Sequence, residues 1–146
     1  MNTRIKSEDW VALVLWIIIP VVVFHLVIGN FWKTMDITLS TKATIFESLF
    51  NMIVLPIYLV IIGNRYIKDT SFRDQIIIGF LMVIGIGLSI FLHFRNWADN
   101  GGSWQNPDRG TLAVIQLELF IGVAVVLIGV VIRWLVGKFG KRYSFD

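Results

Sequence analysis

The chain contains 146 residues, of which 56% are hydrophobic and 16% charged, and its mean hydropathy is +0.75. A soluble domain usually carries about 25% charged residues, so this chain has more apolar surface than a soluble protein of its size can bury. It has no cysteine, which excludes disulfides, thiolate metal sites, iron–sulfur clusters and cysteine nucleophiles. We therefore expect one lipid-covered domain, residues 1–146, and no nucleic-acid partner despite the net charge of +3.

Four segments are long and apolar enough to span a bilayer, which takes about 20 residues per helix. Their apolar runs are continuous and do not alternate, which indicates helices and excludes barrel strands. The first segment is too long for the apolar region of a signal peptide, so we expect it to be retained. The sequence predicts an all-α integral membrane four-helix bundle with antiparallel up-and-down topology, whose spans are roughly residues 10–32, 43–63, 76–94 and 111–135.

The basic residues indicate which way the bundle faces. Nine of the 13 Lys and Arg residues flank one end of the predicted spans, and four flank the other. Because cytoplasmic loops are enriched in Lys and Arg, both termini are predicted to be cytoplasmic and the protein to lie in the cell membrane. The cytoplasmic set is Arg4, Lys6, Arg65, Lys68, Arg73, Arg133, Lys138, Lys141 and Arg142, and the outer set is Lys33, Lys42, Arg95 and Arg109.

The connections and span ends support this arrangement. The cytoplasmic connection 64–74 is short, so the second and third spans should form a hairpin. The outer connection 95–110 is the longest, and its Asn, Gly, Asp and Pro residues are turn formers. An aromatic belt is predicted from the tryptophans at or near span ends, which are Trp10, Trp32, Trp97, Trp104 and Trp134.

Each predicted span carries one histidine or glutamate within its apolar run: His25, Glu47, His93 and Glu118. Such groups are costly in a membrane and are functional hypotheses by default. His25 and Glu118 each lie about seven residues from the outer end of their span, Glu47 about four, and His93 about one or two. At a rise of about 1.5 Å per residue, all four fall within roughly 10 Å of the outer interface.

Helical periodicity places each of these residues on the small or polar face of its own helix. Residues three, four or seven apart share a helix face, and small residues mark the faces where membrane helices pack closely. The predicted packing positions are Gly85, Ser89, Gly122 and Gly129. The shared faces are His25 with Gly29; Glu47 with Asn51 and Tyr58; Gly85 and Ser89 with His93; and Glu118 with Gly122 and Gly129.

The sequence therefore predicts that His25, Glu47, His93 and Glu118, with Asn51, converge in the outer half of the bundle. Imidazoles and carboxylates could ligate zinc, copper or iron there. The two histidines could bind a haem axially, and a carboxylate–histidine pair could shuttle protons or bind a quinone head group. The same groups could instead only hydrogen-bond one another and pin the helices together, or contact a partner subunit.

Three functional hypotheses remain open at this level. No HExxH, GxSxG or P-loop motif is present, so no catalytic residue is assigned. The first hypothesis is a membrane subunit or accessory protein that acts through helix–helix contacts with other membrane subunits or with itself. The second is a membrane redox protein or enzyme that uses the outward-facing His/Glu pocket, and the third is a small transporter.

Short segments at three helix ends are similar to those of the DoxX-like family of small four-helix membrane proteins. They read HLVIGNFWK from His25, IIGNRY from Ile61, and GKRYSFD from Gly140 to Asp146. The length and the predicted topology also agree with that family. The resemblance implies a membrane subunit associated with quinone-linked redox chemistry or with oxidative-stress complexes.

Overall fold

The computed structural model describes residues 5–32, 44–67, 71–99 and 109–140, and nearly all of them are helical. The second helical segment is described from Thr44 and continues into a short π-helix before its last α-helical part. The labelled elements are α1 (Ser7–Trp32), η1 (Phe50–Val54), α3 (Leu55–Ile67), α4 (Phe72–Asp99) and α5 (Arg109–Gly140).

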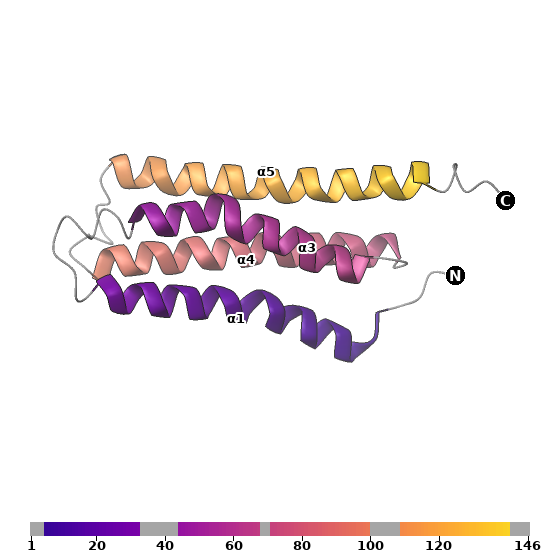
Figure 1. Ribbon diagram of the computed structural model, residues 1–146, viewed down its shortest axis with the longest axis horizontal. Coiled ribbons are helices and arrows are strands. Elements are labelled where there is room, and N and C mark those ends of the chain that lie inside the picture. The colour runs from indigo at the N-terminus through magenta and orange to yellow at the C-terminus, as the bar shows by residue number, and fades with distance from the viewer. Residues whose placement is uncertain (1–4, 33–43, 68–70, 100–108, 141–146) are drawn as a thin grey trace.

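The helices lie side by side in an elongated bundle (Figure 1). Helices α3 and α4 occupy the middle, with α1 packed on one side of them and α5 on the other. Helix α1 begins and α5 ends at the same end of the bundle; the opposite end, where α1 ends and α5 begins, is called the polar end below. In the part of the chain that the structure describes, four helices are long and apolar enough to cross a membrane, as predicted: Ser7–Asn30, Thr44–Tyr66, Phe72–Asp99 and Arg109–Arg133.

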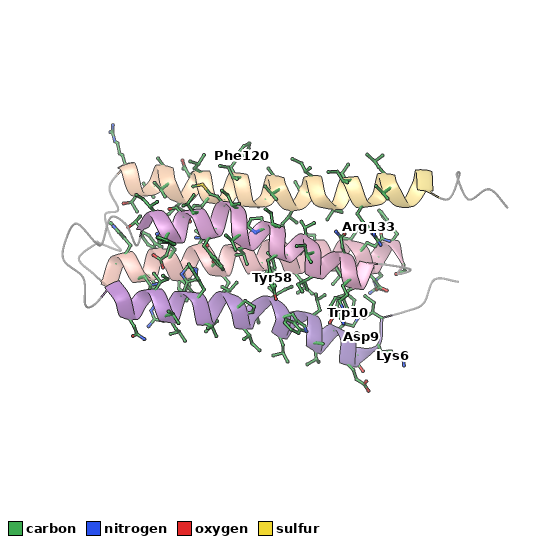
Figure 2. All side chains as sticks on the ribbon, viewed as in Figure 1. Lys6, Asp9, Trp10, Tyr58, Phe120 and Arg133 are labelled. Carbon is green, nitrogen blue, oxygen red and sulfur yellow. The ribbon has the colours of Figure 1, made fainter. Side chains whose placement is uncertain are left out.

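The surface of the bundle is as apolar as its core. Buried leucine, isoleucine, valine and methionine side chains from all four helices form one cluster, which includes Leu13, Leu59, Met82 and Val126. Yet large apolar side chains also point outward, such as Phe120, which is 74% exposed and points away from the bundle in Figure 2. A helix that is hydrophobic all round is typical of a membrane span.

Helix α4 is longer at both ends than the third predicted span. It begins at Phe72 because the Ser71 hydroxyl accepts a hydrogen bond from the backbone N–H of Asp74 (3.2 Å), which caps the helix. It runs on to Asp99, so residues 95–99, which we assigned to the outer connection, are helical. No glycine or proline interrupts the chain before Gly101, and polarity alone does not end a helix.

A π-helical turn in the second span changes which residues face the core. The Leu55 N–H bonds to the Phe50 carbonyl, five residues back. An α-helix would place Glu47, Asn51 and Tyr58 on one face, but the wider turn brings Leu59 to that face instead. The prediction for Tyr58 was therefore wrong, because periodicity assumes an unbroken α-helix.

Tyr58 instead compensates for a proline in the neighbouring helix. Its hydroxyl donates a hydrogen bond to the Trp16 carbonyl (2.8 Å), and its side chain lies between its own helix and α1 (Figure 2). Trp16 lies four residues before Pro20, which stands inside α1 and has no N–H to donate. Since an unsatisfied carbonyl is costly in an apolar environment, this contact ties α1 to α3.

Tyr58→Phe is expected to lower the free energy of unfolding by about 1 kcal/mol, because it leaves the Trp16 carbonyl without this donor. Denaturation in detergent micelles would measure the change. The double-mutant cycle with Pro20→Ala is the control, since alanine restores the N–H at position 20. If Tyr58→Phe costs as much in the Pro20→Ala background as in the native chain, the hydroxyl does not serve that carbonyl.

Glycines stand where helices approach most closely. A Cβ atom on Gly85 would lie 2.6 Å from Ile17 Cγ2, and one on Gly129 would lie 2.6 Å from Val60 Cγ2. At Gly122 the nearest atom would be Ile86 Cγ2, at 3.1 Å. The predicted packing glycines thus face neighbouring helices, and larger residues there would push the helices apart.

Candidate functional site

Six polar side chains from the four spans meet inside the bundle near its polar end. Each of them is at most 4% exposed. Helix α1 contributes one, the second span two, α4 two and α5 one. They are called the polar ring below, and they are His25, Glu47, Asn51, Ser89, His93 and Glu118.

One arc of the ring runs from α1 through α4 to the second span. His25 Nδ1 lies 3.0 Å from Glu47 Oε1, and its Nε2 lies 2.7 Å from Ser89 Oγ. The Ser89 hydroxyl donates to Asn51 Oδ1 (2.6 Å). Ser89 was predicted as a small packing residue, and the structure shows that its hydroxyl also joins three helices.

The other arc closes the ring through α5. Asn51 Nδ2 donates to Glu118 Oε2 (2.7 Å). His93 Nδ1 lies 3.2 Å from Glu118 Oε2 and 3.0 Å from Oε1, while its Nε2 lies 3.4 Å from Glu47 Oε2. The contact with Oε1 is not aligned for a hydrogen bond, so within the described residues this buried oxygen has no donor. The six side chains therefore form a closed cycle.

The hydrogen-bond directions fix where protons lie. A serine hydroxyl has one hydrogen, and Ser89 gives it to Asn51, so His25 Nε2 must donate to Ser89. His25 Nδ1 then faces Glu47 with a single proton between them, carried either by the imidazole or by the carboxyl group. A charged pair and a neutral pair both satisfy this geometry, so His25 and Glu47 together carry no net charge in either case.

Asn96 is a further residue in contact with the polar ring, and the sequence reasoning missed it. Its Nδ2 donates to Glu47 Oε1 (2.8 Å) and to the backbone carbonyl of His25 (3.1 Å). We assigned it to the outer connection, but it lies three residues after His93 and seven after Ser89 on α4. That spacing places all three on one helix face, and extending the helix by one turn would have revealed it.

Aromatic rings cover His25 on the side of the second span. Phe24 and Phe50 stack with ring centroids 3.7 Å apart, and both meet the imidazole edge-on, at 5.2 and 6.0 Å. Phe50 and Asn51 both belong to the π-helical turn. Such turns are frequent at functional sites. Here the turn directs Asn51 into the polar ring and Phe50 against the imidazole of His25.

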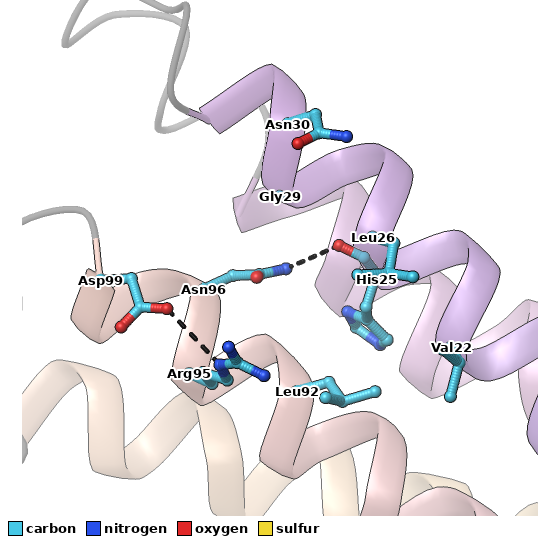
Figure 3. Close-up of a pocket in the computed structure, with 9 residues that line it drawn as sticks. All are labelled: Val22, His25, Leu26, Gly29, Asn30, Leu92, Arg95, Asn96 and Asp99. Atoms are coloured by element: carbon cyan, nitrogen blue, oxygen red, sulfur yellow. Dashed lines mark hydrogen bonds and ion pairs between the residues drawn. The ribbon is translucent and has the colours of Figure 1, made fainter.

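Two cavities reach the ring from different sides. One, of about 190 Å³, lies between the ends of α1 and α4 and is lined by His25, Asn96 and Arg95, among others (Figure 3). The other, of about 230 Å³, is lined by His93 together with Trp97 and Thr111. Both histidines therefore border a cavity, although both nitrogens of each ring face partners within the polar ring.

The arrangement does not fit a metal or a haem. Within the described residues, no group of three or more His, Asp or Glu side chains has the geometry to hold a metal ion. Both imidazoles contact the same carboxylate, Glu47, at 3.0 and 3.4 Å. A porphyrin needs its own space between two axial histidines, and none is left between His25 and His93.

No protein-family model, curated protein or solved structure matches this chain. The resemblance to the DoxX-like family therefore stays a prediction. Its third segment, from Gly140 to Asp146, lies almost wholly outside the described residues, as do Trp104 and the first residue of the second predicted span.

Proposed function

We propose that the chain is an integral protein of the cell membrane that works as a subunit or accessory protein of a membrane complex, through contacts between its helices and those of a partner. In this proposal the bundle is antiparallel with both termini in the cytoplasm, and the polar ring locks the four helices in register. The resemblance to the DoxX-like family implies that the partner complex takes part in redox chemistry.

The closed polar ring carries this proposal. Both nitrogens of each buried histidine already face partners within the chain. A site built to bind a ligand through its imidazoles would leave a ring nitrogen facing the cavity without a partner in the chain. Here they join all four spans, so they stabilise one arrangement of the helices, and the surface left for partners is the outer one. Helix α5 offers the largest share of this outer surface, because only 17% of its most apolar stretch is buried within the bundle.

The alternative proposal is a redox protein or enzyme that binds a small molecule, such as a quinone head group, beside the ring. The two cavities that border His25 and His93 favour it. Binding through an imidazole nitrogen would require that histidine to leave Glu47, Ser89 or Glu118. A small transporter is a further proposal with less support, because the described core towards the other end of the bundle is built largely of apolar side chains.

Site-specific photo-cross-linking in the native membrane tests the proposal. A photoreactive residue at Phe46, Phe80 or Phe120, which are 65%, 67% and 74% exposed, should yield a discrete protein adduct from at least one position. The control is the same residue at Met82, which is 1% exposed and should yield none. Adducts with lipid alone at all three outward positions would contradict a subunit role, and a Soret band or stoichiometric metal in the purified protein would favour the redox alternative.

The proposed orientation predicts which positions an impermeant thiol reagent reaches in intact cells. The chain has no cysteine of its own, so each introduced cysteine reports one position. Ser7→Cys and Ser144→Cys should resist labelling, whereas Ser103→Cys should react, because nine of the 13 basic residues flank the side of the termini. Labelling at either terminus in unbroken cells would overturn the orientation.

A further inference from the structure

The cavity between α1 and α4 at the polar end changes character along its length. Towards the middle of the bundle its wall is mostly apolar and is formed by Val22, Leu26 and Leu92, with the buried imidazole of His25 beside them. Towards the helix ends it is lined by Asn30, Arg95, Asn96 and Asp99 (Figure 3). A cavity that is apolar on one side and charged on the other matches a molecule with the same division.

The charged part of this cavity lies at the depth of lipid headgroups. Helix α4 has 28 residues, which at the usual rise makes it about 42 Å long, whereas the hydrocarbon core of a bilayer is about 30 Å thick. A helix of this length extends beyond the hydrocarbon, and we place its last turn outside because the charged side chains of Arg95 and Asp99 are costly within it.

Arg95 and Asp99 present opposite charges one helical turn apart. The guanidinium Nε lies 3.5 Å from Asp99 Oδ2, and the two side chains are 59% and 50% exposed. An exposed pair of this kind contributes little to stability. A guanidinium carries five N–H donors, and it binds phosphate oxygens in a bidentate geometry.

We propose that this cavity binds a phospholipid whose headgroup carries a phosphate and a primary ammonium, as phosphatidylethanolamine does. The phosphate contacts Arg95, the ammonium donates to the Asp99 carboxylate, and an acyl chain follows Val22, Leu26 and Leu92. The cavity has a volume of about 190 Å³, and an engineered protein cavity of about 150 Å³ holds benzene, so the cavity accommodates only the part of the lipid that lies next to Arg95 and Leu92. This inference rests on the proposed location in a membrane.

The two charges select among lipids. A choline headgroup has no N–H to donate to Asp99, and a glycerol headgroup has no cation to face it. Phosphate recognition by Arg95 is common to all three. The preference for the ethanolamine headgroup therefore depends on Asp99, whereas Arg95 contributes to the binding of every phospholipid.

Native mass spectrometry of the delipidated full chain, titrated with lipids of identical acyl chains, tests the proposal. Phosphatidylethanolamine should bind about tenfold more tightly than phosphatidylcholine or phosphatidylglycerol, the effect of one charge-assisted hydrogen bond. Arg95→Gln should weaken all three, and Asp99→Asn should abolish the preference. Arg109→Gln and Asp9→Asn, at exposed positions outside the cavity, are the matched controls and should change nothing.

Equal binding of the three lipids by the native chain would overturn the proposal. So would equal binding of glycerophosphoethanolamine, which has the headgroup without acyl chains and would show that the ligand is a soluble phosphate ester. Circular dichroism of each variant confirms that it is folded. If carbonate extracts the chain from membranes, the proposed membrane location is wrong. The failure of the lipid proposal and the failure of the membrane location are therefore distinguishable.

Discussion

Glu47→Leu is expected to lower the free energy of unfolding by about 3 kcal/mol, because it leaves several buried polar groups without a partner. Glu47 is fully buried and contacts His25, His93 and Asn96. Leucine accepts no hydrogen bond, so three polar groups from two helices would lose a partner. Reversible unfolding in mixed micelles, followed by circular dichroism, measures the difference.

Two variants serve as controls for this result. Glu47→Gln keeps an oxygen that accepts from His25 and Asn96, so it should cost less than half as much as leucine. Phe46→Leu changes the neighbouring residue, which is 65% exposed, and should alter stability by no more than about 0.5 kcal/mol. A Glu47→Leu chain as stable as the native one would show that the polar ring does not lock the helices.

Gly85→Leu is expected to prevent assembly of the bundle or to destabilise it by more than about 3 kcal/mol, beyond the usual range for overpacking. The first atom of any side chain there would lie 2.6 Å from Ile17 Cγ2. Ile17 is 3% exposed and β-branched, so it has little freedom to rotate away. Helices α1 and α4 would have to separate, which would also pull His25 from Ser89.

Gly87→Leu is the matched control, because it makes the same substitution two residues along the same helix. A Cβ at Gly87 meets no atom within 4 Å, so leucine there should leave stability within about 0.5 kcal/mol of the native value. Ile90→Leu, a volume-conserving change in the core, should cost less than about 1.5 kcal/mol. If leucine is tolerated equally at positions 85 and 87, the face of α4 that carries Gly85 lies against lipid.

The amino-acid sequence by itself determined the class of the fold and the membership of most of the polar ring. Continuous apolar runs of about 20 residues can only be satisfied as membrane helices. Counting from the span ends and along the helix faces was enough to place His25, Glu47, His93 and Glu118 at one level and towards the inside. These signals are local, because depth and facing depend only on the rise and the turn of a single helix.

Only the tertiary structure decided which residues surround the polar ring and how neighbouring helices contact one another. The π-helical turn at Phe50–Val54 replaces Tyr58 with Leu59 on the buried face, and no periodicity count includes an extra residue in one turn. Asn96 enters because α4 continues past His93, although its residues are polar. The Tyr58–Trp16 contact joins residues 42 positions apart. Each of these features depends on contacts with a neighbouring helix, and the sequence pattern of a single helix does not show which residues it contacts on another helix.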